Sequence, residues 1–252
     1  TRDSAVGKTL LYVDIYKSLK SDIECGTISV GNFLPSESEL TQRFSCSRMT
    51  VRKAISLLAN DGWVQSIRGR GVRVIWNARG SVKKENVFSV EGLPSFTESA
   101  HAIGAVPSAY VFLLDHVVCT TEIADMTGFP EGTDLTRVGL VRSLDGKRMA
   151  IDRHHFLTSE IPGIDRKVAT SSLFHYIEVD LGIDIVVSER EITVEKPTVQ
   201  DRKLLSLEGP IYLAVTHSRT YDSNGVEFEY VEGKYLPQYF HFFDTATRNP
   251  LP

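Results

Sequence analysis

The chain is poor in cysteine and contains no long apolar run. Its three cysteines, Cys25, Cys46 and Cys119, are odd in number and widely scattered, so they offer neither a disulfide framework nor the paired spacing of a zinc site. No apolar stretch approaches the roughly 18 residues that span a bilayer. Residues 1–20 also lack the hydrophobic segment of a secretory signal. We therefore expect a cytoplasmic protein with no membrane partner.

Motifs for cofactors and metal ions are missing as well. The run Gly69, Arg70 and Gly71 is too short for a nucleotide-binding glycine loop. The seven histidines show no ligand spacing. His154 and His155 are adjacent on an expected strand, where neighbouring side chains point to opposite faces and cannot easily share one ion. We expect no cofactor and no metal site.

The composition is that of an ordinary globular protein, but its charge is unevenly distributed. At 252 residues, of which 42% are hydrophobic and 24% charged, the chain can bury two cores. Residues 1–80 contain 12 Lys+Arg and 7 Asp+Glu, a net charge of +5, whereas residues 81–252 contain 16 and 25, a net charge of −9. Because DNA repels acidic surfaces, a nucleic-acid contact is expected only in the first third.

Residues 34–71 predict two short helices followed by a hairpin. Ser36 can cap a helix over Glu37–Phe44, and the turn at 45–47 supplies the cap of the next helix. Apolar residues at helical spacing then predict a second helix over Arg48–Asn60. The stretches 63–67 and 72–75 alternate like strands around a tip that contains Arg68 and Arg70. This order predicts a winged helix-turn-helix, the alternative being a helical bundle with a solvated surface hairpin.

The second helix of this block has cations at its N-terminal end. Arg48, Arg52 and Lys53 oppose the helix macrodipole there, so stability alone does not account for them, whereas a phosphate backbone would. In a helix-turn-helix the second helix enters the major groove with its N-terminal residues nearest the bases. Arg48, Thr50 and Arg52 are therefore the expected readers, and Met49 is a candidate apolar contact.

The remaining chain predicts an α+β fold. A first helix over Leu10–Ile23 packs behind the other two, and the polar, basic stretch 77–86 is typical of a linker. Hairpin turns at 145–146 and 224–225 favour a mostly antiparallel sheet. Strands are expected at 110–118, 135–144, 149–157, 185–194, 211–221 and 228–235, and helices at 96–103, 121–126, 173–181 and 199–204.

These motifs resemble known families. The elements LPSE at 34–37, SRMTVRKA at 47–54 and DGW at 61–63 resemble the DNA-binding domain of the GntR family of bacterial transcription regulators. Residues from about 88 to 243 resemble the effector-binding UTRA domain of its HutC branch, whose fold is similar to chorismate lyase. The segments 87–98, 143–152 and 172–178 look most like trehalose operon repressors. The resemblance implies a DNA-binding domain at 1–76, a linker at 77–86 and an effector-binding and dimerisation domain at 87–252.

The resemblance also implies two sets of site residues. On the DNA side we predict contacts to operator double-stranded DNA from Ser36, Glu37, Ser47, Arg48, Met49, Thr50, Arg52, Arg68, Gly69 and Arg70. For a sugar-phosphate effector, the phosphate-holding positions fall on Ser95, Phe96, Thr97, Arg142 and Ser172, and the sugar-contacting positions on Asp152, Phe174, Glu229 and Tyr235. Serine hydroxyls and helix-opening N–H groups suit an anion, and an arginine completes the clamp. Some sugar-phosphate-binding relatives place a second basic residue where this chain has Leu140, and some have an aromatic hydroxyl at the position of Phe174.

The implied protein is a homodimeric repressor that releases its operator when the effector binds. Several residues have simpler interpretations: Arg142 can pair with Asp152 or Glu229, Ser172 can be only a helix cap, and Phe174 can belong to the core. Glu229 follows Phe228 and precedes Tyr230 on a strand, so alternation makes it face opposite to both, into a pocket or into water.

Two other functional classes remain open from the sequence. An enzyme of chorismate-lyase-like fold could use carboxylates and arginine for acid and base chemistry, although no nucleophile or metal motif marks a reaction centre. A purely architectural DNA binder would bind its operator regardless of any metabolite.

Overall fold

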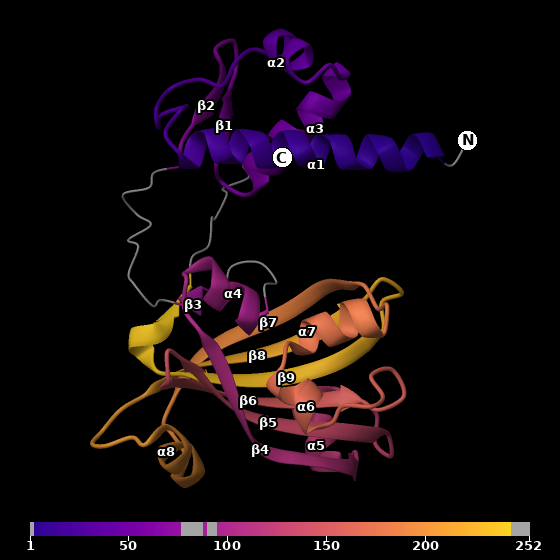
Figure 1. The fold of residues 1–252 in the computed structure, drawn as a ribbon, viewed down its shortest axis with the longest axis vertical. Helices are drawn as coiled ribbons and strands as arrows, with labels where there is room; N and C mark the ends of the chain where they lie inside the picture. The colour runs from indigo at the N-terminus through magenta and orange to yellow at the C-terminus, as the bar shows by residue number, and fades with distance from the viewer. Residues whose placement is uncertain (1–2, 77–87, 90–94, 243–252) are drawn as a thin grey trace. The chain divides into compact units, whose positions relative to one another are not determined.

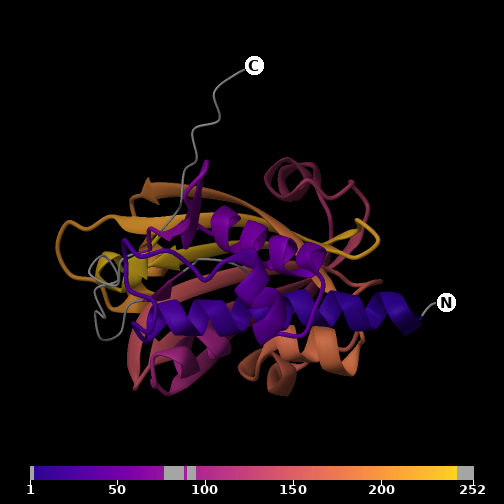
Figure 2. The same cartoon turned by 90° about the horizontal axis from the view of Figure 1, so that it is seen from above.

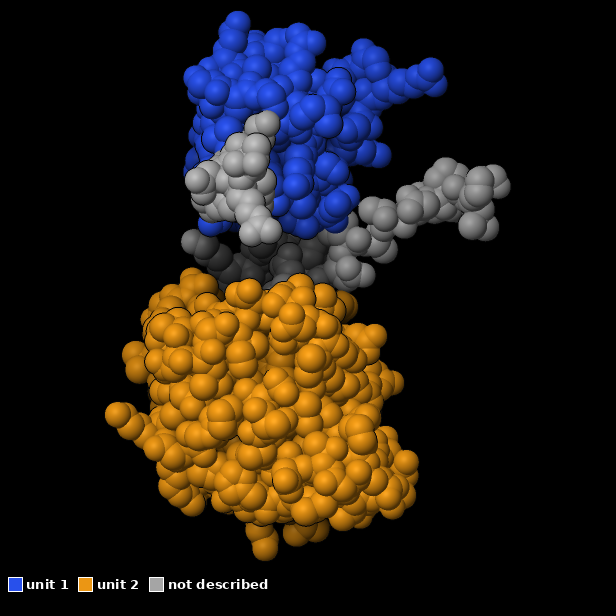
Figure 3. Space-filling model, turned by 90° about the vertical axis from the view of Figure 1, so that its right-hand side faces the viewer, with its two compact units in different colours: residues 1–83, 245–252 blue, residues 84–244 orange. Residues whose placement is uncertain are grey.

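The computed structural model describes residues 3–76, 88–89 and 95–242. It divides the chain into two compact units, residues 1–83 with 245–252 and residues 84–244 (Figure 3). The expected linker at 77–86 lies outside the described residues, so the domain bounds inferred from the sequence stay a prediction. Within the described part of the chain, no helix combines the length and the apolar character needed to cross a membrane.

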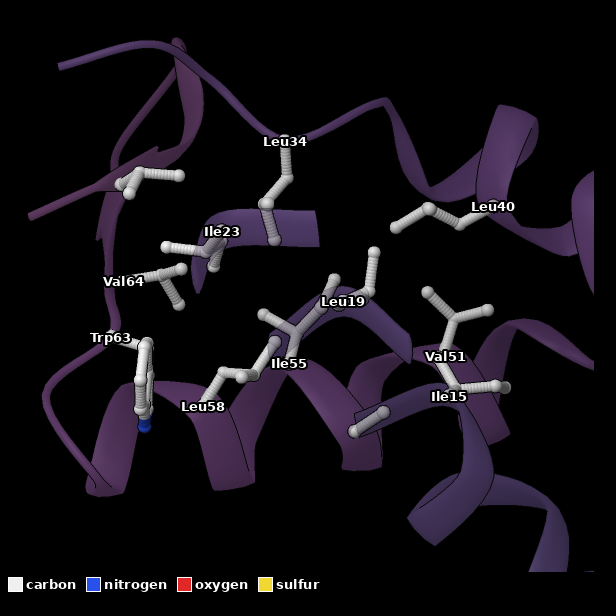
Figure 4. Close-up of a cluster of buried hydrophobic side chains, with 12 residues drawn as sticks. Ile15, Leu19, Ile23, Leu34, Leu40, Val51, Ile55, Leu58, Trp63 and Val64 are labelled. Atoms are coloured by element: carbon white, nitrogen blue, oxygen red, sulfur yellow. The ribbon is translucent and has the colours of Figure 1, made fainter. Parts of the chain in front are cut away.

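The N-terminal unit is a winged helix-turn-helix, as the sequence predicts. Its elements in chain order are α1 (Asp3–Glu24), α2 (Glu37–Arg43), α3 (Arg48–Asn60), β1 (Val64–Ile67) and β2 (Gly71–Val74). α1 begins earlier than expected and packs along α3; it is the indigo helix of Figures 1 and 2. β1 and β2 pair antiparallel. Figure 4 shows the core of this unit, in which Ile15, Leu19, Leu40, Val51 and Leu58 are fully buried.

Local signals fix the two helix starts. The Ser36 side chain accepts a hydrogen bond from the N–H of Glu39, whose carboxylate accepts the N–H of Ser36 in return, which completes a capping box. Ser47 caps α3 by accepting from the N–H of Thr50. Gly62 follows α3 with a φ of 74°, a left-handed conformation in which glycine is unstrained. The predicted caps are confirmed.

The C-terminal unit is built on one six-stranded antiparallel sheet of order β4-β5-β6-β9-β8-β7. Its strands are β4 (Pro107–Val118), β5 (Asp134–Leu144), β6 (Lys147–Leu157), β7 (Ile185–Glu195), β8 (Leu213–Asp222) and β9 (Glu227–Tyr235). Its helices are α4 (Phe96–Ala102), α5 (Thr121–Thr127), α6 (Arg166–Thr170), α7 (Leu173–His175), which continues into the π-helical turn η1 (Tyr176–Asp180), and α8 (Val199–Leu205). The α+β class and the antiparallel sheet are confirmed.

The shortest elements were not predicted from the sequence. β3 (Phe88–Ser89) and β10 (Phe240–His241) form a separate parallel pair, and η2 (Pro237–Tyr239) is a single 3₁₀ turn. Helix α6, only five residues long, was also not expected. Segments this short contain too few residues for the apolar periodicity of a helix or of a strand to be recognisable. The expected helix over 173–181 exists, but as α7 and η1 in succession.

The two faces of the sheet are covered by different helices. Helices α6 and α7 with η1 pack on one face through a cluster that includes Leu140, Phe156, Leu173 and Ile177, and α4 covers the end of this face (Figure 1). On the opposite face, α8 packs near Val141, while α5 packs with other buried residues there. The cavity described below lies on the first face.

One expectation about β9 is wrong. Tyr230 lies opposite to Glu229 as expected, in the cluster beneath α5, but Phe228 packs in the same cluster as Phe156 and Leu140, on the side of Glu229. The cause is a β-bulge: Glu229 is paired with Thr220 and Glu227 with Tyr221, so Phe228 is an extra residue in its strand. Strict alternation fails at that point.

Candidate functional site

The N-terminal half of α3 is the first candidate surface. Arg48, Met49, Arg52 and Lys53 are exposed there, and Met49 keeps 71% of its surface accessible. A methionine this exposed adds nothing to the core, so it is available to a partner. Thr50 is half-buried, and its hydroxyl lies 2.8 Å from that of Ser47.

Two of the predicted DNA-contacting residues are also joined to each other. Nε of Arg52 donates to both carboxylate oxygens of Glu37, at 2.9 and 3.0 Å, and so links α3 to the first turn of α2. Hydrogen bonding to this carboxylate, reinforced by its charge, raises the pKa of Arg52. Ser36 and Ser47 are exposed but have structural roles as helix caps.

The wing presents two cations at its tip. Arg68, Gly69 and Arg70 are all exposed between β1 and β2. Gly69 has a φ of 71°, and the N–H of Arg70 donates to the carbonyl of Ile67 to close the turn. The N-terminal unit therefore exposes cations both on α3 and on the wing.

In the C-terminal unit, all nine residues predicted to bind an effector line one cavity. They come from α4 and the residue before it (Ser95, Phe96, Thr97), from β5 (Arg142), from β6 (Asp152), from α7 and its cap (Ser172, Phe174) and from β9 (Glu229, Tyr235). The strands contribute residues whose side chains leave the same face of the sheet. That these residues bind an effector remains a prediction.

Arg142 stands at the end of the cavity nearest α4. It is buried, and its Nε donates to Oδ2 of Asp152 at 2.8 Å; its guanidinium also lies 5.1 Å from the ring centroid of Phe96. Pairing with Asp152 is thus a real role of Arg142, as one alternative interpretation held. The terminal nitrogens of this guanidinium take no part in that bond.

Serine hydroxyls border the same end. Ser95 and Ser172 each cap a helix by accepting a backbone N–H, from Glu98 and His175 respectively. Because a hydroxyl can accept and donate at once, each O–H can still point into the cavity. Ser172 is therefore both a cap and a lining residue, and half-buried Phe174 lies in the lining while its neighbour Leu173 belongs to the core.

Next to Asp152 the cavity contains a buried hydrogen-bond chain, which begins with His154, whose Nε2 lies 3.9 Å from Oδ2 of Asp152. Nδ1 of His154 lies 2.7 Å from Oε1 of Glu229, and the hydroxyl of Thr220 donates to Oε2 at 3.1 Å. Glu229 is only 1% exposed, which answers the question of whether it faces water. If Nδ1 carries the proton, Nε2 of His154 is an acceptor; it is buried and has no hydrogen-bond partner among the described residues.

Several lining residues were not found from the sequence. They are His154, Leu173, Ser188, Arg190, Thr216, Ser218, Thr220 and Val231. Thr216, Ser218 and Thr220 alternate along β8, and this period of two in small hydroxylated residues is a signal that could have revealed them. Arg190 has no such signal, since both faces of β7 mix apolar and charged residues.

Burial changes the pKa of two side chains in the cavity, Arg190 and Tyr235. It lowers the pKa of Arg190, because the charged guanidinium is partly desolvated. It raises the pKa of Tyr235, to which the nearby Asp152 carboxylate also contributes. Tyr235 is therefore a neutral hydroxyl at any physiological pH.

The described residues contain no group of three or more His, Cys, Asp or Glu side chains that could hold a metal ion. His154 lines the cavity, whereas His155 lies near Tyr230 on the other face of the sheet. The expected separation of the adjacent histidines on opposite faces is confirmed.

Comparison with known proteins assigns both units. The model of bacterial regulatory proteins of the gntR family matches residues 11–74, and the UTRA domain model matches residues 102–241. The chain is 32% identical to the HTH-type transcriptional regulator TreR of Bacillus subtilis, over 94% of this chain and 97% of that protein. It is 28% identical to the HTH-type transcriptional repressor NagR of the same organism, over 92% and 93%.

Solved structures share this fold. The structure of the possible transcriptional regulator YydK from Bacillus subtilis superposes with a TM-score of 0.76 at 23% identity, covering 94% of this chain and 99% of that one. The effector-binding domain of the B. subtilis trehalose repressor TreR superposes with a TM-score of 0.51 at 25% identity, covering 57% and 99%. The chain belongs to the gntR family of bacterial regulatory proteins and carries a UTRA domain, so it is a DNA-binding transcriptional regulator rather than an enzyme.

Proposed function

We propose that this regulator represses a carbohydrate-utilisation operon and releases its operator when a sugar phosphate enters the cavity of the C-terminal unit. Trehalose 6-phosphate is the first candidate, because the name trehalose repressor belongs to a relative whose effector-binding domain shares this fold. The observation that carries the proposal is the lining of the cavity, which combines the Arg142 guanidinium and serine hydroxyls with the hydrogen-bonded chain of His154, Glu229 and Thr220.

The Arg142 guanidinium and the serine hydroxyls are suited to a phosphate. Arg142 is held in place by Asp152, so its terminal N–H groups are oriented before a ligand arrives. Ser95 and Ser172 can donate hydroxyl hydrogen bonds from two separate helix starts. A phosphate with three free oxygens can accept from all three side chains, whereas a neutral molecule cannot use the charge of the guanidinium.

The chain of His154, Glu229 and Thr220 is suited to a polyol. Glu229 retains acceptor capacity beyond its bonds to His154 and Thr220, and Nε2 of His154 can accept a further hydrogen bond. The hydroxyls on β8 can both donate and accept. A sugar ring presents several hydroxyls at once and can satisfy these groups, and Tyr235 and Phe174 can pack against it.

On the DNA side we propose a homodimer, joined through the C-terminal units, that presents two copies of α3 to half-sites of a near-palindromic operator. Arg48, Arg52, Arg68 and Arg70 supply phosphate contacts, and Arg48, Thr50 and Arg52 discriminate between bases. Effector binding then needs to change the free energy of operator binding by only about 1–3 kcal/mol to alter affinity roughly 5- to 150-fold.

A thermal-shift screen against a panel of sugar phosphates tests the effector, because a ligand that binds the folded state alone raises the melting temperature by mass action. We expect a sugar phosphate to stabilise the protein far more than the unphosphorylated sugar or inorganic phosphate. The stabilising compound should then release the protein from an operator duplex in an anisotropy titration. Operator affinity that ignores every stabilising compound would refute the proposal and favour an architectural role.

A further inference from the structure

We propose that Glu37 is a positioning residue for base recognition: by binding Nε of Arg52, it directs the two terminal NH₂ groups of that guanidinium toward a single guanine. The inference rests on the proposed DNA contact of α3 and deepens it. It starts from the ion pair between the first residue of α2 and the fifth residue of α3, in which both carboxylate oxygens of Glu37 lie within 3.0 Å of Nε.

The pair is poorly placed to serve folding. The side chain of Arg52 is 60% exposed and that of Glu37 38% exposed, and ion pairs in water contribute little to stability. The core of this unit is formed instead by apolar residues such as Leu40 and Val51, which are fully buried. A carboxylate fixed beside a DNA-reading helix also repels phosphate groups. A feature that adds little stability and opposes DNA binding in general calls for a more specific role.

The geometry supplies that role. Guanine presents two acceptors, O6 and N7, in the major groove, and a guanidinium reads them with two parallel N–H groups. Glu37 occupies Nε and so leaves the terminal nitrogens of Arg52 for the base. Arg48, Arg68 and Arg70 differ in this respect, since none of them forms an ion pair within 4.0 Å inside the described ranges. The Arg52 guanidinium is thus oriented before it meets DNA, whereas no carboxylate among the described residues orients the other three.

Glu37 should therefore improve specificity in two ways. A guanidinium that is already oriented loses less conformational freedom when it binds its base, which favours the correct site. At an incorrect site the carboxylate still repels the phosphates, with no base contact in compensation, which weakens non-specific binding. Both effects raise the ratio of specific to non-specific affinity, although the second lowers overall affinity.

The test uses the full-length protein and Glu37→Gln, which keeps the size of the side chain and removes its charge. The probes are a duplex enriched from a randomised library by the parent protein and a shuffled duplex of the same composition, both measured by fluorescence anisotropy. We expect the affinity ratio to fall about ten-fold, with weaker binding to the enriched duplex and tighter binding to the shuffled one. Asp14→Asn removes an exposed charge from α1 and should leave the ratio unchanged.

A second arm asks whether Glu37 acts through Arg52. In an Arg52→Ala background, Glu37→Gln should no longer lower the ratio, because the group that it orients is gone. If Glu37→Gln leaves the ratio of the two affinities unchanged in the parent, or lowers it equally in both backgrounds, this inference alone is overturned. A parent protein without salt-sensitive binding to any duplex would overturn the proposed function and this inference together.

Discussion

Variants of the buried pair of Arg142 and Asp152 can separate an effect on ligand binding from an effect on stability. Arg142 has 7% of its side chain exposed and Asp152 has 11%, so removing the arginine leaves a carboxylate in a poorly solvated site. Breaking such a pair on one side typically costs about 3–5 kcal/mol of stability. Arg142→Ala should therefore be strongly destabilised in urea titrations, whether or not the arginine also binds a ligand.

The double variant Arg142→Met with Asp152→Leu removes both charges and refills their volume. Replacing a buried ion pair by apolar residues of similar size is often neutral, so we expect most of the lost stability to return. Binding should not return, because the charge-assisted hydrogen bonds to the phosphate are still missing. These bonds contribute about 1.5–3 kcal/mol, which corresponds to a roughly 10- to 150-fold weaker Kd for trehalose 6-phosphate in calorimetric titrations.

Asp152→Asn provides the opposite control. It keeps Arg142 and removes the neighbouring negative charge, so affinity for inorganic phosphate should rise while affinity for the sugar part declines. The phosphate assignment is wrong if the stable double variant binds the sugar phosphate as tightly as the parent. It is equally wrong if Asp152→Asn weakens inorganic phosphate as much as Arg142→Ala does.

Three further outcomes follow from single residues. Burial, with a smaller effect from the Arg137 guanidinium, lowers the pKa of His155 from 6.5 to about 4. Its contribution to stability is therefore full above pH 6.5 and falls by about 3 kcal/mol as the pH drops to 4; urea titrations should find this pH dependence reduced in His155→Gln. A Cβ on Gly233 would lie 2.8 Å from Thr216 Oγ1 and from the Tyr235 ring. Gly233→Ala should therefore cost about 1–3 kcal/mol and weaken effector binding. Gly225→Ala also loses stability, because its φ is 78°, but its Cβ would meet nothing within 4 Å, so effector binding should change less. Arg52→Ala should weaken operator binding without changing the affinity for the sugar phosphate, and a parallel loss of both in anisotropy and calorimetry would contradict the separation of the two sites.

The sequence was sufficient for most of the fold because its signals are local. The capping residues Ser36 and Ser47 and the alternation of the long strands depend on neighbours a few residues away, and these predictions are confirmed. The expected helix over 173–181 required a correction, since its second half adopts π-helical hydrogen bonding. The bulge at Phe228 also could not be predicted, because it is a property of how β9 pairs with β8.

The candidate cavity, too, could be predicted from the sequence only in part. The residues carried over from the resemblance all line it, but the chain of His154, Glu229 and Thr220 is created by pairing between three strands. No spacing in a single strand encodes that arrangement. The partner of Arg52 is similar, since Glu37 lies 15 positions away on another helix. Such contacts depend on tertiary packing, which periodicity does not describe.

The lining of the cavity contains a second arginine, Arg190, that the sequence did not reveal. Leu140 stands where some relatives have a basic residue, and it is fully buried in the cluster with Phe156, so it lies in the core rather than at the cavity. Arg190 supplies a guanidinium instead, from β7 at the edge of the sheet, and it lines the same cavity as Arg142. The sheet curls far enough for this, since Ile192 of β7 packs in one cluster with Leu144 of β5 and Ala150 of β6. A leucine at position 140 therefore does not leave Arg142 as the sole cation among the described residues that line the cavity.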